Sequence, residues 1–245
     1  MSDLLLELKG VHTHIGAYHI LHVVDLQVPE GQVTMLLGRN GAGKTTTLRT
    51  IMGLWPAGPG ELRFRGESLR GKATPDIASM GIAYVPESMG IFSDLTVQEN
   101  MVVAARSARH AGELDTQRLE WIFGLLPALR KFWLYPAGKL SGGQKQMLAV
   151  ARAIVEPRAL LLIDEPSKGL APSIINNLIA AFGELKRQRT TILLVEQNFH
   201  VARSLGDTVA VMDNGAVVHA GPMRELADDE ALQQRLLGLS LGIHQ

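Results

Sequence analysis

Eight residues near position 40 have the composition and spacing of a phosphate-binding loop. The run Gly38-Arg39-Asn40-Gly41-Ala42-Gly43-Lys44-Thr45 fits the pattern G-x-x-x-x-G-K-[ST], and Thr46 follows it. The glycines let backbone N–H groups turn toward phosphate oxygens, and a helix that begins at the end of the loop adds partial positive charge. Lys44 can reach the β- and γ-phosphates, and the Thr45 hydroxyl can ligate Mg²⁺. The run therefore predicts a site for the phosphates of a nucleotide.

Two adjacent carboxylates follow an apolar run in the last third of the chain. Residues 159–163 are typical of a buried strand, and Asp164 and Glu165 come directly after it. In a parallel sheet, ligands bind at the carboxyl ends of the strands. Because neighbouring side chains on a strand point to opposite sides, we expect these two carboxylates to have different roles. Asp164 is the expected Mg²⁺ partner, directly or through water, and Glu165 the general base for an attacking water.

A third segment suggests a second anion site. Leu140-Ser141-Gly142-Gly143-Gln144 precedes a predicted helix and offers a hydroxyl and open backbone N–H groups at the start of that helix. Taken alone, the segment also fits an ordinary helix cap followed by flexible glycines. Beside one phosphate loop, a second such segment suggests a second nucleotide or a second subunit.

The elements that must position these residues alternate between strands and helices. Apolar, β-branched runs predict strands at residues 4–8, 23–28, 33–37, 62–64, 82–85, 160–163, 191–195 and 209–212. Apolar residues three and four apart predict helices at residues 45–52, 174–188 and 200–205. Continuous apolar strands that alternate with helices imply a mostly parallel sheet covered on both faces.

The middle of the chain differs from both ends because residues 95–155 are mostly helical in pattern. Thr96 with Glu99 forms a predicted capping box, Asp115 is the predicted cap of a second helix, and Ser141 precedes a third. We therefore predict an α/β core with an N-terminal antiparallel β subdomain in residues 1–86 and 156–245. Residues 87–155 are predicted to form an inserted helical subdomain.

Composition excludes several classes of protein and partner. Of 245 residues, 46% are hydrophobic, and 24 Lys and Arg balance 24 Asp and Glu, which argues against disorder and against nucleic acid or an anionic membrane as an electrostatic partner. The absence of cysteine excludes disulfides, Cys-ligated zinc and Fe–S clusters. No apolar run approaches the ~20 residues of a membrane span, and the first residues lack the pattern of a signal peptide. A cytosolic location is expected.

Together, the three motifs resemble those of the ATP-binding cassette (ABC) family, the ATPase subunits of membrane transporters. Residues 38–45 match the Walker A loop, residues 140–144 the LSGGQ signature and residues 160–165 the Walker B strand, in the order and separations of that family. The resemblance covers essentially the whole chain and implies a P-loop NTPase fold, with ATP and Mg²⁺ as ligands. It also implies head-to-tail pairing of two cassettes, in which Ser141, Gly142, Gly143 and Gln144 of one subunit close on the ATP of the other.

Departures from the family pattern indicate a subfamily. This chain has Glu87 where most cassettes carry Gln, Gln197 where most carry His, and the run Ser167-Lys168-Gly169-Leu170-Ala171-Pro172 where most carry an Asp. The VPE, GLAP and VEQN segments resemble importer ATPases for branched-chain amino acids, specifically the shorter of their two paired subunits. Glu87 is implied as a Mg²⁺ ligand that adds negative charge near the phosphates. Gln197 can hydrogen-bond the γ-phosphate or orient water but cannot take a proton, which leaves Glu165 as the base candidate.

The resemblance implies an ATP-hydrolysing subunit that powers amino-acid uptake through an integral-membrane permease. A second ABC ATPase subunit, as heterodimer or homodimer, and an indirect solute-binding protein are the further implied partners. The chain would lie at the cytoplasmic face of the membrane through its permease. The same motor with another cargo, such as urea, an amide or a lipid, is one alternative. A non-transport ATPase of DNA repair or translation is another, disfavoured because about 95 residues without a heptad run separate the motifs.

The sequence leaves the roles of four sets of residues undecided. The base-stacking aromatic of the family falls near Ile15, so His14, Tyr18 or Ile15 could face the adenine. Lys168 stands where related importers often have Glu and has no explanation. Four histidines are expected to be scattered on a β-ribbon, with zinc binding as the alternative, and five aromatics to be core or a docking surface for a membrane subunit. These two sets are His12, His14, His19 and His22, and Trp121, Phe123, Phe132, Trp133 and Tyr135.

Overall fold

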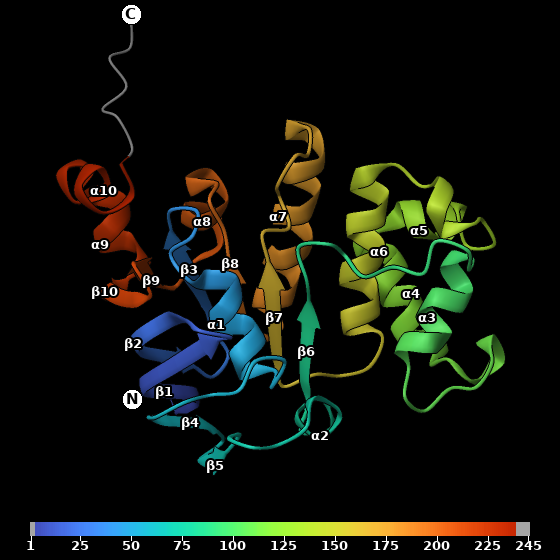
Figure 1. Cartoon of the computed structure of the whole chain (residues 1–245). Coiled ribbons are helices and arrows are strands. Elements are labelled where there is room, and N and C mark those ends of the chain that lie inside the picture. The colour runs from blue at the N-terminus through green and yellow to red at the C-terminus, as the bar shows by residue number, and fades with distance from the viewer. Residues whose placement is uncertain (1–2, 239–245) are drawn as a thin grey trace, which may run out of the picture.

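A computed structural model describes residues 3–238, and half of its ten-stranded sheet is parallel (Figure 1). The strands lie in the order β5-β4-β1-β2-β10-β9-β3-β8-β7-β6, and the last five run parallel to one another. These five are β9 (Thr208–Asp213), β3 (Val33–Gly38), β8 (Thr191–Val195), β7 (Leu160–Asp164) and β6 (Ile82–Val85). Every residue of β3, β7 and β8 is buried, as expected of strands that are covered on both faces.

The other half of the sheet is antiparallel in most of its pairings. Its strands are β1 (Leu4–Ile15), β2 (Tyr18–Pro29), β4 (Glu61–Phe64), β5 (Glu67–Ser68) and β10 (Ala216–Pro222). β10 pairs antiparallel with β9 and touches β2 through one parallel pair, Ala216 with Val23. Burial alternates along β4, which is typical of a strand with one solvated face. The antiparallel strands at the N-terminus agree with the predicted architecture.

Two apolar cores lie on opposite faces of the parallel strands. In β8, Ile192 and Leu194 belong to one core, and Leu193 and Val195 to the other, because side chains alternate along a strand. Helices α7 (Pro172–Arg187) and α8 (Phe199–Leu205) pack into the first core. Helix α1 (Lys44–Ile51) packs into the second, between the parallel strands and the β1–β2 pair.

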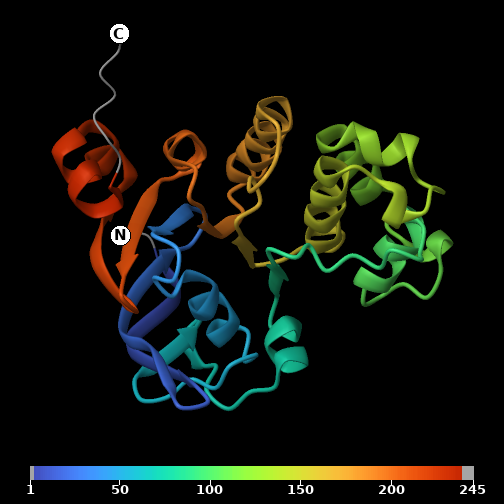
Figure 2. The same cartoon turned by 45° about the horizontal axis from the view of Figure 1, so that its top comes forward.

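The helices of the middle segment gather beside β6 and β7, apart from the antiparallel strands (Figure 2). They are α3 (Val97–Ala104), α4 (Thr116–Leu125), α5 (Pro127–Lys131) and α6 (Gly142–Ile154), with 3₁₀ turns at Ala111–Glu113 and Ala137–Lys139. The three predicted caps are confirmed, since Thr96, Asp115 and Ser141 each accept the backbone N–H three residues on. The division of the chain near residues 87 and 155 stays a prediction.

Several short elements were not predicted. They are β5, β10, α2 (Thr74–Ser79), α5, α9 (Met223–Asp228) and α10 (Glu230–Leu237). In α2 the buried residue is Ile77, and α10 has no fully buried residue, so neither has a wide apolar stripe to signal a helix. Among residues 3–238, no helix combines the length and apolar character that a membrane crossing requires.

Candidate functional site

The predicted phosphate loop connects the end of β3 to the start of α1, and its glycines are required by its geometry. Gly38, Gly41 and Gly43 have φ values of 144°, 81° and 105°, in the region that side chains rarely adopt. A Cβ on Gly38 would lie 2.3 Å from the carbonyl oxygen of Met212, and one on Gly43 would lie 2.8 Å from Leu21. The loop therefore packs against β9 and β2 with room for backbone alone.

Lys44 directs a buried ammonium group back over this loop. Its Nζ donates hydrogen bonds to the carbonyl oxygens of Gly38 (2.9 Å) and Arg39 (3.1 Å) and lies 3.7 Å from Glu165 Oε1. The side chain is 4% exposed, and this burial lowers the pKa of Lys44, while the Glu165 carboxylate opposes the shift. A compact positive charge among carbonyl oxygens is suited to exchange these partners for phosphate oxygens.

Asp164 ends β7 and is fully buried beside the first turn of α1. It accepts hydrogen bonds from the Thr45 hydroxyl (3.1 Å) and from the Tyr84 hydroxyl (3.4 Å). Burial raises the pKa of Asp164, and the carboxylates of Glu165 and Glu87 add to this shift. Oxygen donors from a carboxylate and a hydroxyl are the kind that Mg²⁺ prefers, so this pair fits the predicted metal.

The donor set is small, and its size agrees with the usual chemistry of Mg²⁺. Within the described residues, no cluster of three or more His, Cys, Asp and Glu is arranged as a metal site. Mg²⁺ commonly takes one or two carboxylates and completes its octahedron with waters and substrate phosphates. The same finding gives no support to the zinc alternative for the histidines.

Glu165 lies beside Lys44 and Gln197, which the sequence separates widely. Its φ of 46° is unusual for a residue with a side chain, and its N–H donates to Val195 O (2.9 Å). Gln197 Nε2 donates to Glu165 Oε1 (2.5 Å) and to Asn40 Oδ1 (2.7 Å). Glu165 and Asp164 thus have different partners, in agreement with the expected difference in their surroundings.

A cavity of about 360 Å³, the phosphate cavity, is lined by several of the predicted site residues, but Gly38, Arg39, Ala42, Asp164 and Gln197 are not among them. The signature residues 141–144 are not among those that line it. Instead, Ser141 and Gln144 form a capping box at the start of α6, where Ser141 is exposed. The residues that line the cavity are Ile20, Asn40, Gly41, Gly43, Lys44, Thr45, Thr46, Glu87, Glu165 and Lys168.

Lys168 belongs to the site, although its sequence position had no explanation. Its Nζ lies 2.5 Å from Glu87 Oε1 and 3.5 Å from Glu165 Oε2. The hydrogen bond to Glu87 raises the pKa of Lys168, and the Glu165 charge adds to the shift. The sequence signalled neither contact, because residues 166–169 form a turn rather than a helix and Glu87 lies 81 positions away.

Glu196 is a second residue that the sequence analysis missed. It is buried and accepts hydrogen bonds from the Ser167 hydroxyl (2.8 Å) and from the backbone N–H groups of Ser167 (3.1 Å), Gln197 (3.2 Å) and Asn198 (3.3 Å). Burial raises the pKa of Glu196 despite these donors. The carboxylate joins the loop after β7 to the loop after β8, and so fixes Gln197 relative to Glu165.

The four histidines lie on β1 and β2 but are not scattered. His14 and His19 stack with ring centroids 4.1 Å apart, while His12 and His22 pack on the same ring at 5.2 Å and 4.3 Å. Tyr18 is 75% exposed at the hairpin tip. Of this region, Ile20 lines the phosphate cavity, so the choice among His14, Ile15 and Tyr18 as the residue facing the base stays open.

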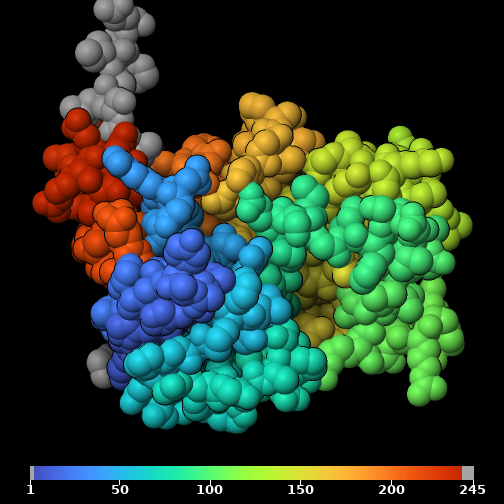
Figure 3. All heavy atoms as spheres, viewed as in Figure 1, coloured from blue at the N-terminus to red at the C-terminus, as the bar shows by residue number. Residues whose placement is uncertain are grey.

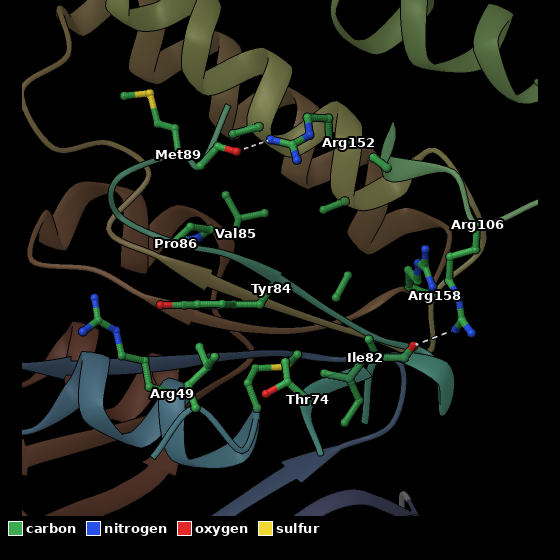
Figure 4. A pocket seen from close by; sticks show the side chains of 18 of the residues that line it. Arg49, Thr74, Ile82, Tyr84, Val85, Pro86, Met89, Arg106, Arg152 and Arg158 are labelled. Atoms are coloured by element: carbon green, nitrogen blue, oxygen red, sulfur yellow. Dashed lines mark hydrogen bonds between the residues drawn. The ribbon is translucent and has the colours of Figure 1, made fainter. Parts of the chain in front are cut away.

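A larger cavity of about 770 Å³ lies between α1–α2 and the helical segment (Figures 3 and 4). Its wall is mostly apolar, and Arg152 Nη1 donates to Gly90 O (2.5 Å) at one side. Pro86, Met89 and Gly90 line this cavity, whereas Glu87 lines the phosphate cavity, so one short segment borders both. Four arginines also line it, namely Arg49, Arg106, Arg152 and Arg158.

Comparison with known proteins identifies the family to which this arrangement belongs. The ABC transporter family model matches residues 21–168, more than half of the chain. The chain belongs to the ABC transporter family. It is an ATPase domain of that family, and its P-loop fold and ATP-hydrolysing class are those predicted.

Similar proteins are transport ATPases. The chain is 40% identical to the branched-chain amino acid transport ATP-binding protein BraG of Pseudomonas aeruginosa, over 87% of this chain and 91% of that protein. It is 33% identical to the probable branched-chain amino acid transport protein LivF of Archaeoglobus fulgidus, over 90% and 93%. A solved ATP-binding subunit of an ABC transporter is 30% identical, with a TM-score of 0.78 over 97% of this chain and 96% of that one.

Replacing Glu196 by Gln is expected to destabilise this ABC ATPase domain by about 1–3 kcal/mol, because an amide nitrogen would then face buried donors. Urea denaturation followed by circular dichroism measures the change. Glu61→Gln, at an exposed ion pair on β4, is the matched control and is expected to change stability by less than about 0.5 kcal/mol. Equal stabilities of the two variants would contradict the assigned role of Glu196.

Proposed function

We propose that this ABC ATPase domain powers the uptake of branched-chain or other hydrophobic amino acids through a membrane permease. The observation that supports this cargo is the 40% identity to BraG over 87% of the chain. Identity is lower, at 30%, to the glutamate transport protein GluA of Corynebacterium glutamicum. The VPE, GLAP and VEQN segments support the same assignment.

The proposed ATP site combines the lining of the phosphate cavity with Asp164 and the rest of the phosphate loop. Backbone N–H groups of residues 38–46 would surround the phosphates, with Lys44 exchanging the carbonyls of Gly38 and Arg39 for phosphate oxygens. Thr45, Asp164 and Glu87 would hold Mg²⁺. When bound, this ion neutralises charge on the phosphate oxygens. The observed Thr45–Asp164 hydrogen bond supports this assignment because it already places both oxygen donors together.

Glu165 is the proposed general base, and Gln197 its orienting partner. The 2.5 Å hydrogen bond from Gln197 fixes one carboxylate oxygen, and Asn40 fixes the same amide from the loop side. Glu165 would accept the proton of a water that attacks the γ-phosphate. Because Gln197 cannot accept that proton, its contribution is positional.

The signature segment is proposed to serve a second ATPase subunit. Ser141 lies exposed at the start of α6, and none of residues 141–144 lines the cavity of its own chain. Its hydroxyl and the N–H groups of Gly142 and Gly143 would meet the ATP of the partner subunit, and the partner's segment would complete this site. Peripheral attachment to the membrane would follow from the permease.

We propose that the larger cavity receives an acidic segment of the permease. Its lining residues include four arginines and no Asp or Glu, and of the four only Arg158 forms an ion pair within the described residues. Figure 4 shows Arg106 and Arg158 at one end and Arg49 near the Tyr84 hydroxyl at the other. Burial and the Asp164 charge raise the pKa of Tyr84 to about 12, so this hydroxyl stays neutral. An apolar groove with basic ends complements a short acidic helix.

The Glu165→Gln variant tests the assigned chemistry. We expect kcat for ATP hydrolysis to fall at least about 100-fold, because the base is lost, while nucleotide still binds. Phosphate release and equilibrium ATP binding are the two measurements. Glu225→Gln on α9 is the control and should retain parental kcat. A Glu165→Gln variant that hydrolyses ATP at the parental rate would contradict the assignment of Glu165 as the general base.

A transport assay in reconstituted vesicles tests the proposed cargo. The membrane subunits that co-purify with this chain from its host can be reconstituted with it in vesicles, together with their solute-binding protein. We expect ATP-dependent accumulation of labelled leucine, abolished when the chain carries Glu165→Gln. Accumulation of labelled ribose, glutamate or urea in place of leucine would replace the proposed cargo with the one transported.

Two variants decide where the permease attaches. Arg106→Glu reverses a charge at the larger cavity and is expected to weaken co-purification of the permease about tenfold, with Arg106→Lys retaining it.

Trp133→Ala removes part of the aromatic cluster, in which Trp133 and Phe123 pack edge to face on the helical core. Unchanged assembly of Trp133→Ala would leave that cluster as core. If Trp133→Ala loses the permease and Arg106→Glu retains it, the docking surface lies on the aromatic cluster instead of the larger cavity.

A further inference from the structure

The phosphate cavity is lined by two carboxylates and two ammonium groups, and ATP would bring further negative charge to it. Glu87 and Glu165 line the cavity together with Lys44 and Lys168, and the buried Asp164 lies next to it through its hydrogen bond with Thr45. Lys44 is engaged with two loop carbonyls and lies nearest to Glu165. A triphosphate adds several further negative charges, so an unpaired carboxylate at the cavity would repel it.

In the described part of the chain, Lys44 forms an ion pair with Glu165 and not with Glu87. Within the described residues, the cation paired with Glu87 is Lys168, at 2.5 Å. The same ammonium group lies 3.5 Å from the second oxygen of Glu165. One exposed lysine therefore bridges two carboxylates that stand 78 positions apart in the sequence.

The backbone beneath Lys168 is held firmly although its side chain is 57% exposed. Lys168 N–H donates to Glu165 O (3.2 Å), Leu170 N–H donates to Ser167 O (3.2 Å), and Ser167 is tied to buried Glu196. The turn thus fixes the origin of the lysine chain beside Glu165. Glu87, by contrast, lies in the loop after β6, whose neighbouring residues line the larger cavity.

We propose that Lys168 is a positioning residue for nucleotide binding: it pairs with Oε1 of Glu87, holds that carboxylate beside Glu165, and leaves Oε2 of Glu87 as the oxygen for the proposed Mg²⁺. The inference rests on the proposed ATP site and extends it to a residue that lies outside the three motifs. It also explains how the chain accommodates a Glu at position 87, since the added negative charge comes with a compensating positive one. A plain surface ion pair is the competing reading, and such pairs contribute little to stability.

The first experiment measures binding of a non-hydrolysable ATP analogue with Mg²⁺ by calorimetry. Lys168→Met leaves Glu87 unpaired, so we expect Kd to rise about fivefold at low salt and the difference to shrink as salt screens the charges. Lys168→Arg is expected to restore affinity to within about twofold because the positive charge remains. Lys72→Met removes a comparable exposed ion pair with Glu67 (2.7 Å) and is the matched control, with parental Kd.

The decisive comparison is the double variant. If Lys168 acts through Glu87, then Glu87→Gln removes the need for it, and Glu87→Gln/Lys168→Met should bind the analogue as Glu87→Gln does. In ATP hydrolysis, Lys168→Met should raise KM by the same factor as Kd, and the double variant should have the KM of Glu87→Gln, which a general loss of structure would not produce.

Two results would overturn the proposal. One is a parental Kd and KM for Lys168→Met, and the other is an undiminished loss in the double variant. Thermal melts check that each variant is folded, and Lys168→Gln is the second neutral variant if Lys168→Met is not. Because Kd is read without turnover, a parent protein that binds nucleotide but does not hydrolyse it would count against the proposed function alone.

Discussion

The buried ammonium group of Lys44 is the interaction on which the site depends. Burying a charge is costly unless partners are placed around it, and here these are two loop carbonyls and the carboxylate of Glu165. The carbonyls can point inward because Gly38 and Gly43 lack side chains that would strike Met212 and Leu21. The carboxylate is in reach because β3, β8 and β7 are consecutive neighbours in the sheet. The glycines of the loop and the order of the buried strands therefore together place the Lys44 ammonium group between the loop carbonyls and Glu165.

The end of β7 shows how two adjacent carboxylates acquire different surroundings. Asp164 is still paired in the strand with Val195 and faces Thr45 and Tyr84. Glu165 leaves the strand with a φ of 46°, and the hydrogen bond to Val195 O holds this strained backbone in place. This backbone conformation turns the Glu165 side chain toward Lys44 and Gln197. Alternation along the strand and one unusual backbone angle therefore separate the two side chains.

What the sequence could predict was encoded locally. The phosphate loop, the strands of the parallel sheet and the caps at Thr96, Asp115 and Ser141 each depend on residues within a few positions of one another. The Glu87–Lys168 pair and the buried Glu196 were missed because their partners lie 81 and 29 residues away, and only the folded sheet brings them together. The histidine stack was missed because strand register, which pairs His14 with His19, decides it. The assigned roles of the site residues remain predictions that the variants above address.

The shared segment after β6 gives a physical route between the two cavities. Pro86, Met89 and Gly90 line the larger one, and Glu87, between them in sequence, reaches Lys168 at the smaller. Ser88 alone separates Met89 from Glu87 in the chain, so a displacement of Met89 is transmitted to Glu87 through few bonds. Coupling between distant sites requires an element with two arrangements that both sites bias. The Glu87–Lys168 ion pair joins the segment beside the proposed docking groove to the turn that follows the proposed base. An occupant of the groove that moved this segment would change the charge beside the phosphates without contacting the nucleotide.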